Sequence, residues 1–113
     1  MSNLTIVTNP SGSASIMTVN GHVDSQTATQ LDDALSALAS KGTNKIVVNL
    51  GELAYMSSAG VRALVKAAKA MKAAGGELKL AAMPEMVKSV MYTVGLDKIV
   101  NLYATVDEAM ASF

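Results

Sequence analysis

Two adjacent serines, Ser57 and Ser58, are the side chains of this sequence best placed to do chemistry. They stand in "YMSSAGVR" (Tyr55 to Arg62), between an apolar segment and the start of an amphipathic helical pattern. A serine directly before a helix accepts a backbone N–H and stabilises that helix end by about 1 kcal/mol. If Ser57 is this cap, Ser58 lies in the first turn with its hydroxyl towards solvent. The pattern therefore predicts one structural serine and one exposed, modifiable serine.

A phosphate on Ser58 would be stable where this pattern places it. Its charge of about −2 would meet the positive end of the helix dipole, and Arg62, four residues on, could reach it. We therefore expect phosphorylation to leave the domain folded and to act on a docked partner through charge and bulk. The alternative is that both serines only cap the helix and turn the chain.

Other chemistry has weaker support in the sequence. His22, Asp24 and the serines could be combined into a hydrolytic triad, but "YMSSAGV" lacks the glycine that stands two residues before the serine of a nucleophile elbow. A lone histidine near a strand end is usually a surface or packing residue. "AAGGELKL" has no P-loop lysine, and its glycines end a helix instead of starting one. With no cysteine in the chain, we predict no enzymatic activity, no cofactor and no metal site.

Composition restricts the chain to a narrow set of protein classes. Its 113 residues, 50% of them hydrophobic, predict a single domain over residues 1–113 with one core. Nine basic and nine acidic residues cancel, so no overall field attracts nucleic acid or an anionic membrane. No basic-flanked leader and no apolar run near the roughly 18 residues of a membrane helix is present. We therefore expect no membrane insertion and no direct nucleic-acid contact. We expect a cytoplasmic protein, because the absence of cysteine fits a reducing cytosol.

The first half of the chain contains two strand patterns, a helix pattern and a third strand pattern. "LTIVTN" (Leu4 to Asn9) and "ASIMTVN" (Ala14 to Asn20) flank the turn signal "PSGS", which predicts an antiparallel edge hairpin. A helix follows, with Asp24 or Ser25 as its expected cap. "NKIVVNL" (Asn44 to Leu50) is a continuous apolar run typical of a central strand covered on both faces. The apolar face of the helix is predicted to comprise Ala28, Leu31, Leu35 and Leu38.

The second half alternates in the same way. A second helix is expected from about Val61 to the glycine stop at Gly75 and Gly76, followed by a strand, "ELKLAAM", and a helix that begins at Pro84. A short apolar run in "KIVNLYAT" and a terminal helix in "VDEAMASF" complete the chain. The apolar stripe of the second helix is Val61, Leu64, Val65, Ala68 and Met71, and its basic row, typical of a solvated face, is Arg62, Lys66, Lys69 and Lys72. The third helix should bury Met86, Val87, Val90, Met91 and Val94, and the terminal helix Val106, Met110 and Phe113.

The order β-β-α-β-α-β-α, with a further short strand and a terminal helix, predicts an α/β fold. Strands joined through helices imply right-handed crossovers and a mostly parallel or mixed sheet of four to five strands. The N-terminal hairpin should lie at one edge. About four helices should cover the sheet, mainly on one face.

The segment "VVNLGELAYMSSAGVRALVKAAK" resembles the STAS domain family, in particular the bacterial anti-sigma factor antagonists. In that family a strand, a short acidic loop and an apolar pair lead to "DSSGLG" and a helix, and the first of the two serines is phosphorylated. Without gaps, Ser58 falls on the phosphorylated serine, Ser57 where aspartate is frequent, Ala59 on the second serine and Gly60 on the glycine. "VNGHVDSQTATQL" also resembles the family's segment before the first helix, and the strand order matches over essentially the whole chain.

The resemblance implies that the chain is an anti-sigma factor antagonist that switches partners. Its unphosphorylated form would bind an anti-sigma factor that is also a serine kinase of the GHKL type, freeing a sigma factor. Phosphorylation at Ser58, with Ser57 as second candidate, would end that binding, and a serine phosphatase of the PP2C type would reset it. The predicted partner-binding residues are Asp24, Ser25, Met56, Ser57, Ser58, Ala59, Gly60 and Arg62. Among them Met56 would be an apolar anchor if it lies at the rim of the loop beside Ser57.

A second interpretation is a STAS scaffold subunit of a stress-signalling or lipid-transport complex, with no covalent switch. Ser57 in place of the family aspartate favours this interpretation. A short chain without a fused sensor or transporter favours partner switching.

Overall fold

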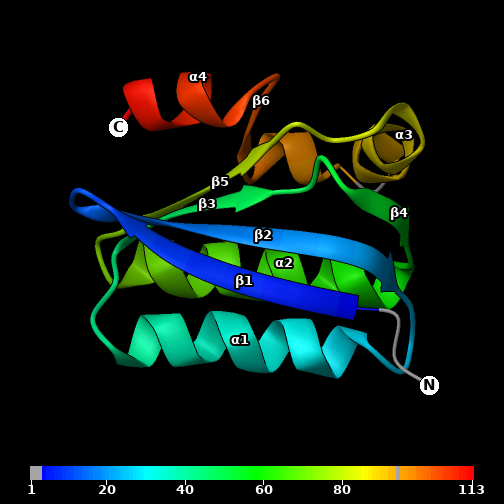
Figure 1. Cartoon of the computed structure of the whole chain (residues 1–113), viewed down its shortest axis with the longest axis horizontal. Coiled ribbons are helices and arrows are strands. Elements are labelled where there is room, and N and C mark those ends of the chain that lie inside the picture. The colour runs from blue at the N-terminus through cyan, green and yellow to red at the C-terminus, as the bar shows by residue number, and fades with distance from the viewer. Residues whose placement is uncertain (1–3, 94) are drawn as a thin grey trace.

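Six strands and four α-helices make up the part of the chain that the structure describes. The structure is a computed structural model that describes residues 4–93 and 95–113. Figure 1 shows the elements as a sheet with helices on both sides. In chain order they are β1 (Leu4–Ser11), β2 (Ala14–Val23), α1 (Ala28–Ser40), β3 (Lys45–Asn49), β4 (Leu53–Met56), α2 (Ser58–Ala73), β5 (Glu77–Ala81), α3 (Glu85–Thr93), the 3-10 turn η1 (Leu96–Lys98), β6 (Asn101–Tyr103) and α4 (Val106–Ala111).

The sheet has the order β1-β2-β3-β5-β6, and β4 pairs with β2. Only β1 and β2 are antiparallel, and the other pairs are parallel, which confirms the edge hairpin and the α/β fold class. The sheet has six strands, against the predicted four to five, because β4 was not predicted as a strand. The first half of β2 pairs with β3 and its end pairs with β4, from Gly21 to Val23, with a register shift after Gly21.

Helices α1 and α2 cover one face of the sheet, as their periodicity predicts (Figure 1). A stripe with helical spacing faces the sheet in each case because such a stripe occupies one side of a helix. In α1 the four predicted residues are all buried. In α2 only Val65 of the predicted stripe is half-buried, and the other four are buried. After α2 the chain turns at Gly75, whose φ of +85° suits a residue without a Cβ.

The terminal helix α4 lies on the opposite face, over β3, β5 and β6. Its buried contact is Ala109, which packs on Val47 and Ala81. Val106 and Met110, predicted to be buried, are half-buried and pack against this cluster, while Phe113 is exposed. The helices therefore do not cover one main face alone. The continuous apolar run of β3 explains this, because alternate side chains of a strand point to opposite faces and both are covered.

Helix α3 packs against β4 and η1 through a narrow apolar stripe. Val87 and Met91 are buried, Val90 is half-buried, and the Pro84 carbonyl accepts a hydrogen bond from the Lys88 N–H in the first turn. The predicted burial of Met86 is wrong, since 56% of its surface is exposed. The contact of this short helix buries Val87 and Met91, which are four residues apart, and Met86 lies outside that narrow stripe. Val94, also predicted on this face, lies outside the described residues.

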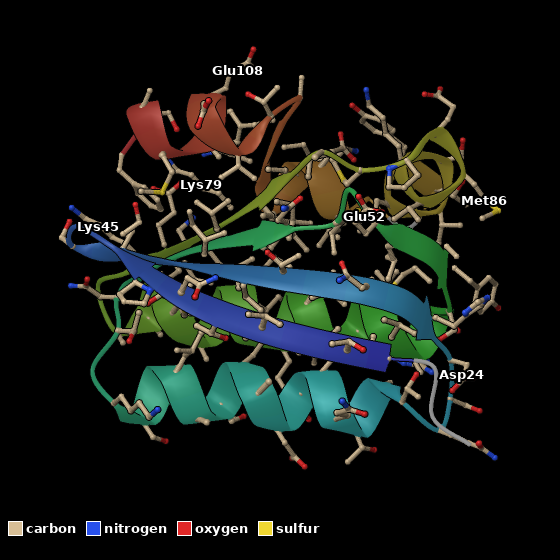
Figure 2. The ribbon with its side chains drawn as sticks, in the orientation of Figure 1. Asp24, Lys45, Glu52, Lys79, Met86 and Glu108 are labelled. Atoms are coloured by element: carbon tan, nitrogen blue, oxygen red, sulfur yellow. The ribbon has the colours of Figure 1, made fainter. Side chains whose placement is uncertain are left out.

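Lys79 of β5 is buried beneath α4, with only 1% of its surface exposed. Its Nζ donates to the Ser112 hydroxyl and to the Ala109 carbonyl at 3.5 Å. The same atom lies 3.9 Å from the Phe113 ring centroid and 5.3 Å from that of Tyr103. Figure 2 shows this side chain rising from the sheet towards α4. Within residues 4–93 and 95–113, no carboxylate forms an ion pair with it, so its charge is compensated only by dipoles and rings.

We expect Lys79→Met to raise the free energy of unfolding by about 1 kcal/mol, because it removes a buried charge that has no counter-ion while keeping the volume. Urea denaturation at neutral pH measures this change. Lys45→Met is the matched control, since Lys45 is half-buried and its Nζ lies 5.8 Å from the same Phe113 ring. A loss of stability in Lys79→Met would show that the ring and carbonyl contacts outweigh the cost of burial.

Candidate functional site

The two serines differ in their surroundings, as the sequence predicts. Ser57 is the N-cap of α2, in an extended conformation, and its Oγ accepts a hydrogen bond from the Gly60 N–H at 3.2 Å. Ser58 is the first residue of the helix and its side chain is exposed. The Ser57 hydroxyl is therefore engaged in the fold, and Ser58 is exposed to solvent.

The start of α2 is fixed to the ends of two strands. The Ser57 N–H donates to the Val23 carbonyl at 2.7 Å, directly after the last β2–β4 pair, Val23 with Met56. Gly60 lies flat against these strand ends. A Cβ added to Gly60 would lie 2.5 Å from Val23 Cγ1 and closer still to Met56 Sδ. The glycine is therefore required by close approach, and it holds the serine turn at the carboxyl ends of β2 and β4.

Met56 does not provide an apolar anchor for a partner. It is only 3% exposed, because its side chain packs beneath Gly60 in the core, and the prediction for this residue is wrong. Along β4 the pattern of exposure places Tyr55 outside, with 44% of its surface exposed, across from His22 of β2. The exposed apolar surface next to the serine turn is therefore Tyr55.

The turn before α1 contains a reciprocal pair that the sequence analysis did not identify. The Asp24 N–H donates to Thr27 Oγ1 and the Thr27 N–H donates to Asp24 Oδ1, both at 2.9 Å. The regular helix begins after Thr27, whose side chain makes no cap hydrogen bond to the helix. Of the two predicted caps, Asp24 makes the capping hydrogen bonds one turn earlier: its carboxylate also accepts the Gln26 N–H at 2.8 Å, and its carbonyl accepts the Ala28 N–H at 2.9 Å. The spacing Asp-x-x-Thr in the sequence was the available signal, because such pairs bond reciprocally at helix starts.

These hydrogen bonds favour the charged form of the Asp24 carboxylate. The backbone N–H of Thr27, followed by that of Gln26, lowers the pKa of Asp24 below its ordinary value of 3.8, against an opposing effect of burial. The turn beside the serines therefore holds a fixed negative charge at neutral pH.

A shallow groove of about 260 Å³ runs between the first halves of α1 and α2. Ser25, Ala59 and Arg62 are among its lining residues. An ion pair at 3.1 Å between Lys66 of α2 and Asp32 of α1 crosses it. Lys66 was predicted only as part of a solvated row, and Asp32 was not singled out, because their proximity depends on how the helices pack. The Arg62 guanidinium has no hydrogen-bond or ion-pair partner among the described residues.

Most of the predicted site residues therefore lie in one region. Ser57, Ser58 and Gly60 form the start of α2, and Ala59 and Arg62 line the groove. Asp24 and Ser25 lie in the turn before α1, and Ser25 also lines the groove. Met56 lies in the same region but is buried. Missed residues are Thr27, Asp32, Lys66 and Tyr55.

Other kinds of site find no support in the described part of the chain. There, no hydrogen bond joins the His22 side chain to Asp24, Ser57 or Ser58. Across residues 4–93 and 95–113, no three histidine or acidic side chains gather as metal ligands do. Over the same residues, no helix has the length and apolar character that a membrane crossing requires.

Comparison with known proteins agrees with this geometry. The profile of the STAS domain family matches residues 5–109. The chain is 35% identical over 98 residues to BtrV of Bordetella bronchiseptica, provisionally named an anti-sigma factor antagonist, in a match that covers 87% of this chain and 84% of BtrV. A Thermotoga maritima crystal structure with the same provisional name has a TM-score of 0.89 at 25% identity, covering 95% of this chain and 92% of that one. The Bacillus cell fate determinant SpoIIAA, in its phosphorylated form, has a TM-score of 0.75 at 20% identity, covering 96% and 98%, a likeness of fold alone.

Gly60→Ala should lower the free energy of unfolding by about 1 to 3 kcal/mol, because the added methyl group overlaps the Val23 side chain, whose Cβ would also lie only 3.3 Å away. Thermal or urea denaturation measures the loss. Ser58→Ala, an exposed neighbour, serves as the control and should change stability by less than about 0.5 kcal/mol. Equal stability of the two variants would mean that α2 does not approach the strand ends this closely.

The effect of Asp24→Asn on stability should depend on pH. The pKa of Asp24 is lowered in the folded state, so its charge contributes stability that is fully present above its unfolded pKa of about 3.9 and is lost as pH falls through the folded pKa. Urea denaturation at several pH values should show wild type exceeding Asp24→Asn at neutral pH, with the difference shrinking below about pH 4. A difference that stays constant with pH would contradict the assigned hydrogen bonds to the carboxylate.

Proposed function

The chain belongs to the STAS domain family, to the type named anti-sigma factor antagonists, and from this membership we propose that it switches partners at Ser58. The unphosphorylated chain binds an anti-sigma factor and so frees a sigma factor. Phosphorylation of Ser58 ends that binding. The chain acts by occupying a partner and performs no catalysis itself.

The observation that carries this proposal is the division of roles between the two serines. Ser57 is used by its cap to the Gly60 N–H, while Ser58 is exposed one residue later. Modification of Ser57 would break the cap, which is worth about 1 kcal/mol. Modification of Ser58 breaks no side-chain hydrogen bond among residues 4–93 and 95–113. Ser58 is accordingly the phosphorylated residue in our proposal, and Ser57 is not.

The surroundings of Ser58 support a phosphate without loss of the fold. The phosphate adds a charge of about −2 at the N-terminus of the 16-residue helix α2, where the dipole favours negative charge. Arg62, unpaired among the described residues and one turn further on, supplies a counter-charge. The folded domain therefore accepts the modification, and its effect falls on whatever is docked there.

Release of the partner needs more than charge repulsion. Moving a complex from almost fully bound to almost fully free takes about 5.5 kcal/mol of differential affinity. The exposed position of Ser58, beside Tyr55 and the groove between α1 and α2, places a phosphate within any surface docked over this region. Steric exclusion then adds to repulsion, and the fixed charge of Asp24 makes the region more negative once Ser58 is modified.

The proposed partners come from the resemblance to the anti-sigma factor antagonists. The enzyme that modifies Ser58 is an anti-sigma factor with serine kinase activity of the GHKL type, and a PP2C-type serine phosphatase removes the phosphate. These two enzymes close the cycle, since one needs the exposed hydroxyl and the other the exposed phosphoserine.

The test compares three forms of the full chain as bait in the native lysate, with bound proteins identified by mass spectrometry. We expect wild type to retain a GHKL-type kinase, and Ser58→Asp to lose it. Ser36→Asp, which adds the same charge at an exposed position in the second half of α1, is the matched control and should retain it.

A second readout fixes the site of modification. Incubation of the captured kinase with ATP should add one phosphate to wild type, mapped to Ser58 by mass spectrometry, and none to Ser58→Ala.

The capture experiment also has an outcome that would contradict the proposal. If wild type and Ser58→Asp hold the same partner equally, Ser58 is not a switch and the chain is a scaffold subunit.

A further inference from the structure

Strand β1 is the long free edge of the sheet. It pairs only with β2, so the backbone groups on its outer side have no strand partner in the described part of the chain (Figure 1). The opposite edge, β6, is only three residues long. Natural proteins protect long edges with charged side chains, bulges or covering segments, because an open edge is a template for pairing with another chain.

The usual protection is missing from the middle of β1. Its sequence, "LTIVTNPS", holds no charged residue, and Val7 at its centre is 45% exposed. The two ends of the strand are less available: the Leu4 carbonyl accepts a hydrogen bond from Gln30, and Pro10 has no N–H to donate. The unprotected edge is therefore the stretch Thr5 to Asn9.

A groove runs alongside this edge on the face that carries α1. Its volume is about 570 Å³, and it separates the β1 side chains of that face from α1. Ile6 and Thr8 line it on the strand side, and on the helix side small and apolar residues at helical spacing include Ala34, Ala37 and Leu38. An added strand would therefore find backbone partners along β1 and room for its side chains beneath.

We propose that the edge and its groove bind a second copy of this chain, with the two β1 strands antiparallel about a two-fold axis at Val7. This register pairs Thr5 of one copy with Asn9 of the other, and Ile6 with Thr8. Because side chains alternate along a strand, Ile6 and Thr8 of both copies face the grooves, and the two Val7 side chains meet on the opposite face. The same patch serves both copies, as a two-fold interface requires.

The charges of the neighbouring helix fit this arrangement. β1 and α1 run in the same direction (Figure 1), so a two-fold axis that makes the strands antiparallel also makes the two α1 helices antiparallel. Asp33 lies in the first half of α1 and Lys41 at its end, and both are exposed. Opposed helices bring the acidic half of one towards the basic end of the other, and no like charges meet along the uncharged strands.

The proposed interface leaves the serine site free and is independent of the proposed function. The groove beside β1 shares no lining residue with the groove between α1 and α2. The dimer therefore presents two Ser58 sites at once. Loss of partner binding in Ser58→Asp would not alter dimerisation, and loss of the dimer would not remove Ser58.

The register can be tested by disulfide trapping, because the natural chain contains no cysteine. Residues on the two-fold axis of antiparallel strands have Cα atoms about 4.5 to 5.5 Å apart, within the span of a disulfide. We expect Val7→Cys to form a covalent dimer rapidly with diamide. Thr5→Cys is the matched control on the same strand, since the two copies of this residue would be about 13 Å apart at 3.3 Å per residue. Non-reducing electrophoresis measures both.

A reversible measurement completes the test without a cross-link. Sedimentation of wild type over a range of concentrations should show twice the chain mass of 11.6 kDa. Val7→Lys should weaken the dimer about tenfold or more, because two ammonium groups then face each other. Ile99→Lys, at another exposed apolar residue, should leave it unchanged. A wild type that stays monomeric, a dimer that Val7→Lys leaves intact, or equal trapping of Val7→Cys and Thr5→Cys would each overturn the proposal.

Discussion

The close approach of helix α2 to the ends of β2 and β4 is the constraint on which the site depends. It exists because Gly60 has no side chain, which lets the helix backbone rest on Val23 and Met56. From this contact follow the position of Ser57, whose N–H bonds to the Val23 carbonyl, and the exposure of Ser58 beyond it. The short strand β4 serves the same purpose, since it brings Met56 beside the end of β2.

Elements whose sequence pattern lies within a few neighbouring residues could be predicted. Elements that depend on contacts between distant segments could not. The stripes of α1 and α2, the hairpin turn and the Ser57 cap each follow from residues within a few positions of one another. Strand β4 has only four residues and pairs at a position set by β2. The burial of Met56 and the placement of α4 over Lys79 likewise depend on how remote segments meet. Local periodicity cannot choose between the two faces of a sheet.

The proposed switch and the proposed dimer use different physical properties of one small fold. At the start of α2, the helix dipole, Arg62 and a satisfied cap allow a charge to appear without cost to the fold. At the β1 edge, the absence of charge allows two identical strands to meet. The two regions share no groove residue, so a chain of this size can hold a copy of itself while it exchanges partners.

The hydrogen bond between Ser57 and Val23 joins segments that lie far apart along the chain. Such a contact exists only when the intervening loop is closed and both segments are in place, because closing that loop costs conformational entropy. The turn that presents Ser58 is therefore absent from a nascent or misfolded chain, although the same residues are there. An enzyme that recognises the shape of this turn acts on the completed fold, so only folded molecules would enter the proposed cycle of modification.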